Sequence, residues 1–121
     1  MRRNELEAYL KDYLKLADFD DDSLNGLQVE GRSEIQSLAI GVTACAEVFQ
    51  EAAEWGADAI IVHHGLFWRG MWPLPVRDIL RDRLGILIGN DMSLFAYHLP
   101  LDAHPLWKVR SEPTHSIKYS N

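Results

Sequence analysis

Two different spacings of apolar residues run along this chain, and they mark its predicted elements. Over residues 3–17 the apolar side chains recur every three or four positions, as they do on one face of a helix. The same spacing returns over residues 75–88, although the piece 84–89 could form a strand instead. The pair Asn25-Gly26 is a turn signal, and it is followed by a short candidate strand at residues 27–29.

Three other segments are almost continuously apolar and are predicted strands: residues 37–43, 59–62 and 93–99. Residues 45–55 carry a helical apolar face and are followed by Gly56, which suits the end of a helix. A strand, a helix and a strand in this order imply parallel pairing with both faces of the sheet covered. The sequence therefore predicts an α/β fold with a mixed or mostly parallel sheet flanked by helices.

The composition narrows the class of protein. The chain has 121 residues, 47% of them hydrophobic and 25% charged, which suits one globular domain. No apolar run reaches the roughly 20 residues that span a bilayer, and the N-terminus lacks a secretory apolar core, so we expect a cytoplasmic protein. A net charge of −6 argues against binding to a nucleic-acid backbone. The single cysteine, Cys45, excludes an internal disulfide.

The apolar content and the periodicity of the sequence change near the C-terminal end of the chain. Residues 1–105 carry the helix and strand patterns described above, and we predict that they form one α/β domain. Residues 106–121 have few aliphatic side chains and no clear period. We therefore expect a divergent polar tail there, rather than another element of the same sheet.

Histidines gather where the predicted strands end. His63 and His64 follow one strand, and His98 and Asp102 lie at or just past the end of another. Ligands of open α/β sheets bind at the carboxyl ends of parallel strands. Imidazole and carboxylate are common ligands of divalent Zn, Fe or Mn. Gly65 would let the chain turn freely after the pair. The alternative is a histidine pair that only bonds to backbone groups at a strand end.

Other polar and aromatic residues near these positions have simpler interpretations. His104 precedes a proline and suits a turn, His115 suits a solvated position in the tail, and residues 20–22 form an acidic run that suits a solvated turn. Three aromatic residues follow the histidine pair and either pack or wall a pocket; they are Phe67, Trp68 and Trp72.

Four motifs, in this order and at these spacings, resemble a known family: SLNGLQVEG, GVTA, ADAIIVHHGLFW and YHLPLDAHP. It is the dinuclear-metal-centre family described as type 2 GTP cyclohydrolase-like and related to the NGG1-interacting-factor-3-like proteins. The resemblance implies two divalent metals in each subunit and assembly into a hexamer. It also implies that His63, His64 and Asp102 are metal ligands. His98 would line the site and act in catalysis, as a proton carrier.

The chain departs from the family pattern after residue 105. Family members continue into a second half, which supplies a further His and Glu in an H-x-x-x-E motif. Here His115 is followed four residues later by Tyr119. The resemblance therefore covers the N-terminal half of the family fold and leaves the metal site incomplete, as in a truncated copy.

Two classes of function follow from this comparison. One is a divalent-metal-dependent hydrolase of the GTP cyclohydrolase-like type, active if the site is completed. The other is a non-catalytic metal-binding or regulatory interaction protein, or a degenerate truncated copy. In either class we expect a homo-oligomer or pairing with a full-length relative, because the apolar strands need cover on both faces.

Overall fold

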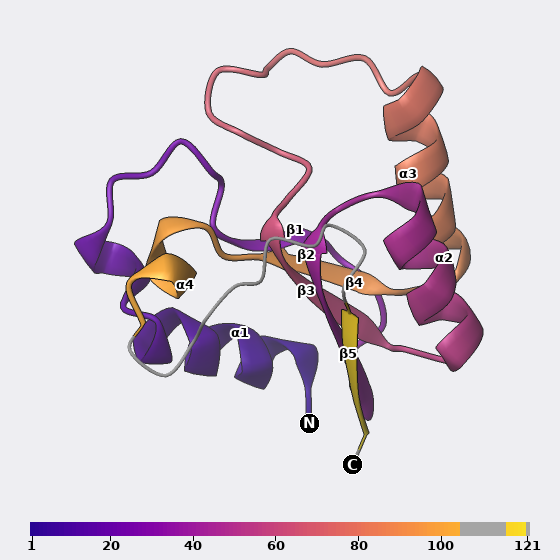
Figure 1. Ribbon diagram of the computed structural model, residues 1–121, viewed down its shortest axis with the longest axis horizontal. Helices are drawn as coiled ribbons and strands as arrows, with labels where there is room; N and C mark the ends of the chain where they lie inside the picture. Colours follow the sequence, from indigo (N-terminus) through magenta and orange to yellow (C-terminus); the bar gives the residue numbers. More distant parts are fainter. Residues whose placement is uncertain (105–115, 121) are drawn as a thin grey trace.

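The computed structural model describes residues 1–104 and the backbone of residues 116–120 (Figure 1). The α-helices are α1 (Arg3–Tyr13), α2 (Ala46–Trp55), α3 (Asp78–Gly89) and α4 (Leu99–Asp102), and a 3₁₀ turn, η1, covers Leu16–Asp18. The strands are β1 (Gly26–Val29), β2 (Ser37–Thr43), β3 (Ala59–His64), β4 (Ser93–Ala96) and β5 (Ser116–Ser120). Within these described residues, no helix combines the length and apolarity needed to cross a bilayer.

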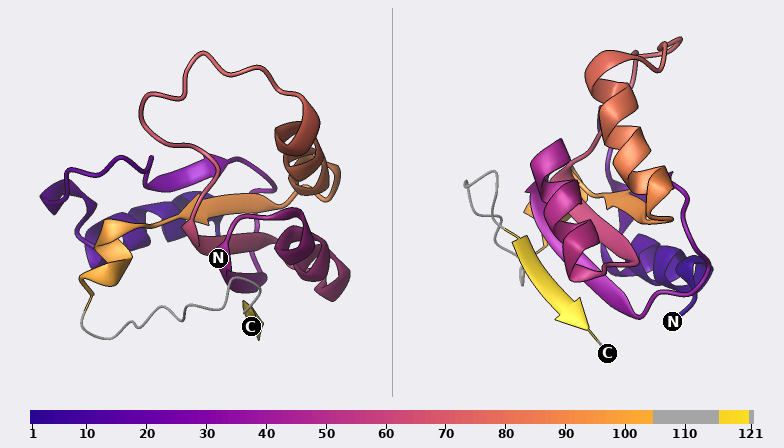
Figure 2. Two further views of the ribbon diagram at one scale, coloured as in Figure 1. Left: turned by 45° about the horizontal axis from the view of Figure 1, so that its top comes forward. Right: turned by 90° about the vertical axis from the view of Figure 1, so that its right-hand side faces the viewer.

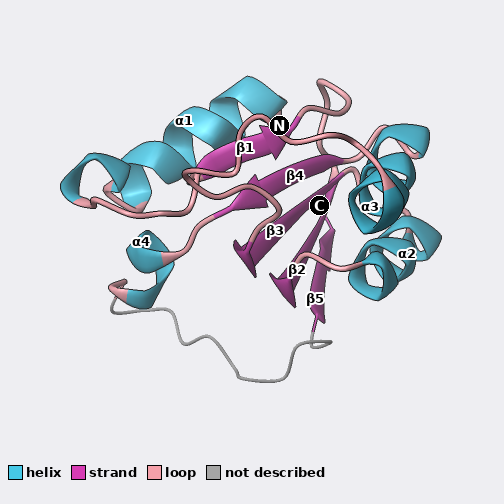
Figure 3. Ribbon diagram, turned by 90° about the horizontal axis from the view of Figure 1, so that it is seen from above, coloured by secondary structure: helices cyan, strands magenta, loops and turns pink. Residues whose placement is uncertain are grey.

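The strands form one sheet in the order β1-β4-β3-β2-β5 (Figure 3). The central strand β3 pairs in parallel with β2 and with β4, whereas β1 and β5 are antiparallel edge strands. This confirms the predicted α/β fold with a mixed or mostly parallel sheet: the three central strands are parallel and the two edge strands are antiparallel. Strand β5 corrects one expectation, because residues 116–120 of the predicted polar tail do add an element to the sheet, paired along β2. Residues 105–115, including His115, lie outside the described part of the chain.

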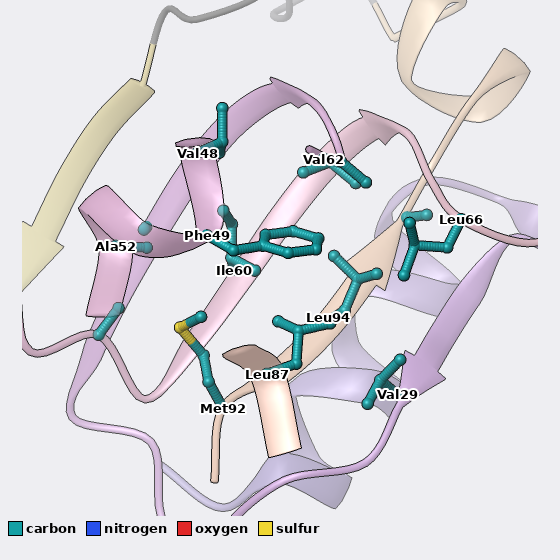
Figure 4. Packing of buried hydrophobic residues seen from close by; sticks show 14 residues of the cluster. Val29, Val48, Phe49, Ala52, Ile60, Val62, Leu66, Leu87, Met92 and Leu94 are labelled. Atoms are coloured by element: carbon teal, nitrogen blue, oxygen red, sulfur yellow. The ribbon is translucent and has the colours of Figure 1, made fainter. Parts of the chain in front are cut away.

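Helices cover the sheet on both faces (Figure 2). Helices α2 and α3 pack on one face, where the core centres on Phe49, Ile60 and Leu87 (Figure 4). Helix α1 packs on the other face, together with Ile61 and Phe95 from the central strands. Alternate residues of β3 and β4 thus enter opposite cores, which explains why these strands are apolar at nearly every position.

The structure changes the bounds of several predicted elements. Strand β3 continues to His64, past the predicted end at residue 62, and α3 begins at Asp78 and not at residue 75. The first helix ends at Tyr13 and not at Ala17, because Lys15 adopts a left-handed conformation that a right-handed helix cannot continue. The strand expected over residues 93–99 stops at Ala96. Beyond it, the N–H groups of His98 and Leu99 donate to side chains of the segment 21–25 and not to the sheet. Residues 84–89 are helical, so the strand alternative for them is wrong.

We predict that Gly31 and Gly85 respond oppositely to alanine. A Cβ at Gly31 would lie 2.6 Å from the backbone of residues 91–93, so Gly31→Ala should cost about 1–3 kcal/mol of unfolding free energy. A Cβ at Gly85, inside α3, would meet nothing within 4 Å, so Gly85→Ala should add about 0.5–1 kcal/mol. Urea denaturation of both variants checks this pair, and equal stabilities would contradict it.

Candidate metal centre

The candidate site lies at the carboxyl ends of β3 and β4. These strands are parallel and in register, with Val62 opposite Ala96, so both chains leave the sheet at the same edge. His63 and His64 are the last residues of β3. His98 lies two residues beyond β4, immediately before α4. The parallel pairing thus brings together side chains that are more than thirty positions apart in the sequence.

The three histidine rings form one cluster. The ring centroids of His63 and His64 are 4.3 Å apart, and that of His98 lies 4.9 Å from the first and 5.6 Å from the second. Each ring offers one nitrogen to a group of three whose members all lie within 4.8 Å of one another. Such a group is compact enough to hold a single cation.

Asp102 adds a carboxylate to the cluster. It ends the short helix α4, and its Oδ1 lies 2.9 Å from Nε2 of His63. The Asp102 side chain is 49% exposed, so one side of the cluster is open to solvent. The structure thus brings together His63, His64, His98 and Asp102, the four residues singled out in the sequence.

The buried ring of His63 is the feature that best supports a metal ion in this cluster. Its side chain is 8% exposed, and neither ring nitrogen has a hydrogen-bond partner of suitable geometry within the described residues. A buried polar atom without a partner is costly. Neutral imidazole nitrogens beside a carboxylate form a donor set that suits Zn, Fe or Mn, and coordination would satisfy a nitrogen of His63.

The surroundings of His64 favour the neutral form of its ring. Burial lowers its pKa, and the neighbouring His63 and His98 lower it further, while Asp102 acts in the opposite direction. The Thr43 hydroxyl lies 3.4 Å from Nδ1 of the ring. A neutral imidazole keeps a lone pair, which a metal ligand needs.

Asp21 is a residue of this site that the sequence analysis missed. It lies in the acidic run expected to be a solvated turn, yet it is 8% exposed. Its carboxylate accepts hydrogen bonds from the N–H groups of Ser23 and Leu99 and from the Asn25 amide, and it lies 3.1 Å from Nδ1 of His98. Burial alone would raise the pKa of Asp21, but these hydrogen bonds outweigh it and hold the pKa far below its usual range.

Gln28 fixes the chain that follows the histidine pair. Its Oε1 accepts from the N–H of Leu66 at 2.8 Å, and its Nε2 donates to the carbonyl of Phe67 at 3.1 Å. Gly65 is required here for space and not for the conformational freedom expected from the sequence. A Cβ at this position would lie 2.5 Å from Gln28 Oε1 and 2.6 Å from the Ala96 Cβ.

The aromatic residues after the pair divide into two roles. Trp68 places its ring edge-to-face against His98, with centroids 5.0 Å apart, and so walls the cluster. Phe67 packs on the core and stacks with the exposed Trp72 at 5.9 Å. His104 does not join the cluster, because its ring packs 4.5 Å from that of Tyr13.

A histidine-rich centre at the carboxyl ends of a mostly parallel sheet defines this chain as an α/β protein with a candidate metal site. The profile of the Duf34/NIF3 (NGG1p interacting factor 3) family matches residues 1–109, and the chain belongs to this family. It is 48% identical over 105 residues to the GTP cyclohydrolase 1 type 2 homolog of Escherichia coli and 40% identical to that of Pyrococcus abyssi. It spans 42% and 41% of these relatives, so the match covers less than half of their length.

Solved structures of similar proteins support the same family and the same fold. The chain aligns with TTHA1606 from Thermus thermophilus with a TM-score of 0.82 at 46% identity, over 86% of this chain and 43% of that one. It aligns with HcgD from Methanocaldococcus jannaschii with a TM-score of 0.74 at 26% identity, over 84% of this chain and 41% of that one. The family and fold inferred from the four sequence motifs are therefore confirmed.

We predict that the metal-free protein loses stability as the pH falls through the histidine range. The pKa of His64 is lower in the folded state than its ordinary value of about 6.5, so the unfolded chain binds more protons between these two values. The free energy of unfolding should therefore fall as the pH drops below about 6.5, while above it this histidine contributes no pH dependence.

Urea denaturation at a series of pH values, in the presence of a chelator, measures this slope. His64→Gln removes the titrating ring and should make the slope shallower. An identical slope in the variant would contradict the assignment to His64.

Proposed function

We propose that this chain supplies a divalent-metal site to a hydrolase-like protein, with His63, His64 and Asp102 as the metal ligands. The observation that carries the proposal is the cluster of His63, His64 and His98, with Asp102 Oδ1 2.9 Å from Nε2 of the buried His63. Within the described residues, neither ring nitrogen of His63 has a hydrogen bond of suitable geometry. Zn, Fe and Mn all suit the donor set, which does not choose among them.

At such a site the metal ion and the protein side chains would have different chemical roles. A bound divalent ion makes water a stronger nucleophile and polarises a substrate oxygen. His98 stands beside the proposed ligands, and histidine is the side chain that most often moves protons at neutral pH. We therefore assign His98 as the group that takes up or returns a proton. Trp68 against its ring would limit access by water on that side.

The substrate is a separate proposal from the metal site. The curated relatives are named as GTP cyclohydrolase homologs, and GTP is the first nucleotide to test. A triphosphate needs cations, and the cation nearest to the histidine pair in the sequence is Arg69. Its guanidinium lies 3.1 Å from a carboxylate oxygen of Asp20 in an exposed ion pair. Hydrolysis of a small substrate is therefore proposed without a commitment to GTP.

A non-catalytic metal-binding or regulatory role is the second candidate. It is compatible with the donor groups that the described part of the chain provides. One group of three potential metal ligands occurs within the described residues. A second ion would therefore need ligands from outside the described residues. We propose that a second copy of this chain, in a hexamer or a smaller oligomer, or a full-length relative supplies them.

We predict that purified chain freed of metal by a chelator binds fewer than two divalent ions tightly. Calorimetric titration with Zn²⁺ and Mn²⁺, together with elemental analysis, measures the affinity and the number of ions per chain. His63→Ala should lower the affinity at least about tenfold, since loss of a supporting partner alone costs about 10–100-fold. Two tightly held ions per chain would show that ligands are missing from our set.

His104→Ala is the matched control, because this histidine lies on the neighbouring chain segment but outside the cluster. It should leave the metal affinity within about twofold of the unchanged protein. Equal losses in His63→Ala and His104→Ala would contradict the proposed ligand set. Turnover of nucleotide substrates by the metal-loaded protein then separates the hydrolase from the non-catalytic alternative.

A further inference from the structure

We propose that Asp21 is the positioning residue of the candidate metal centre. In this proposal its buried carboxylate holds the proton of His98 on Nδ1, so that Nε2 is the free nitrogen available to the cluster. The proposal rests on the proposed metal site for its functional consequence. The state of the His98 ring, however, can be measured without any metal.

The position of the carboxylate supports this role. The Asp21 side chain is 4% exposed, and the His98 side chain is 24% exposed. Asp21 Oδ1 lies 3.1 Å from Nδ1 of His98, while Oδ2 accepts the N–H of Leu99 at 2.9 Å. The carboxylate therefore holds both the ring of His98 and the backbone that carries it.

The hydrogen-bond partners of Asp21 determine the direction of its hydrogen bond with Nδ1 of His98. The main-chain N–H of Ser23 and the amide of Asn25 both donate to its oxygens, and their hydrogen bonds favour the ionised carboxylate. An ionised carboxylate only accepts hydrogen bonds. Nδ1 of His98 must then be the donor, and a neutral ring with a proton on Nδ1 leaves an unprotonated Nε2.

The free nitrogen is the one that the cluster can use. His98 lies within ring contact of both His63 and His64, and it belongs to the group whose ligand atoms are within 4.8 Å of one another. Because Nδ1 is occupied by Asp21, Nε2 remains to accept a proton or to coordinate a metal. A carboxylate behind a histidine is a common way to orient such a ring and to increase its basicity.

The first experiment determines which ring nitrogen of His98 carries the proton, in the unmutated, metal-free chain. Long-range ¹H–¹⁵N NMR distinguishes the protonated from the unprotonated ring nitrogen of each histidine. It should be recorded at about pH 8, above the ordinary histidine pKa of about 6.5. We expect His98 to carry its proton on Nδ1. A proton on Nε2 would overturn the proposal, and this result does not depend on any variant folding.

The second experiment changes the acceptor. In Asp21→Asn the amide oxygen can still accept from both Leu99 and Asn25 when it occupies the place of Oδ2. The amide NH₂ then takes the place of Oδ1, where it faces His98 and gives up the hydrogen bond from the Ser23 N–H. The ring should then accept at Nδ1 and move its proton to Nε2. Asp22→Asn is the matched control, because it makes the same change at the exposed neighbour and should leave the ring unchanged. An Nδ1 proton in Asp21→Asn would overturn the proposal.

A third variant separates positioning from simple structural support. Asn25 accepts the backbone N–H of His98 at 2.8 Å, and its amide also donates to Asp21. In Asn25→Ala the N–H groups of Ser23 and Leu99 would still donate to the Asp21 carboxylate and favour its ionised form. Asn25→Ala should therefore loosen the segment but keep the proton on Nδ1. If Asn25→Ala moves the proton as Asp21→Asn does, the role of Asp21 is structural and the proposal fails.

Zinc titration provides the functional readout. His98 belongs to the group of three imidazoles that could hold an ion, although it is not among the three ligands proposed above. Asp21→Asn should therefore bind Zn²⁺ more weakly than Asp22→Asn, by up to about 10–100-fold, the loss that follows removal of a partner behind a ligating histidine. An equal affinity would overturn the positioning role. If the unmutated chain binds no zinc at all, the proposed metal site fails, and the NMR result alone decides whether Asp21 sets the state of His98.

Discussion

The parallel pairing of β3 with both of its neighbours is the constraint on which the rest of this structure depends. It requires a covering layer on each face, and α1 on one side and α2 with α3 on the other provide it. It also makes the chain leave β3 and β4 at the same edge of the sheet. Polar side chains at the end of one strand and just beyond the other, such as His63 and His98, therefore meet without any strand having to bend.

The sequence predicted the features that a local pattern can encode. The apolar runs of β2 and β3 and the helical face of α2 all appear where expected, and the histidines at the strand ends converge as strand-end geometry required. Asp21 could not be found in this way. An acidic run looks solvated in a sequence, and its burial depends on hydrogen bonds to residues 98 and 99, far along the chain. A strand at residues 116–120 was missed because an edge strand needs no apolar period.

The centre combines a rigid and an adaptable part. His63 and His64 stand on a strand in the middle of the sheet, and His98 is tied to the segment 21–25 by both its ring and its backbone. Asp102 ends a helix of four residues and is half exposed. Preorganised imidazoles lower the cost of ordering a site, and an exposed carboxylate could adjust to the radius of an ion at the proposed centre.

The hydrogen bond between Asp21 and His98 joins residues separated by 77 positions. Closing so long a loop is slow compared with forming a helix or pairing neighbouring strands, and it comes after much of the chain has been made. During synthesis, the histidine pair at residues 63–64 emerges well before residue 98 and Asp102. The proposed site can therefore form only after residue 102 has been made, and a newly made chain presents two of its imidazoles before the other two groups exist.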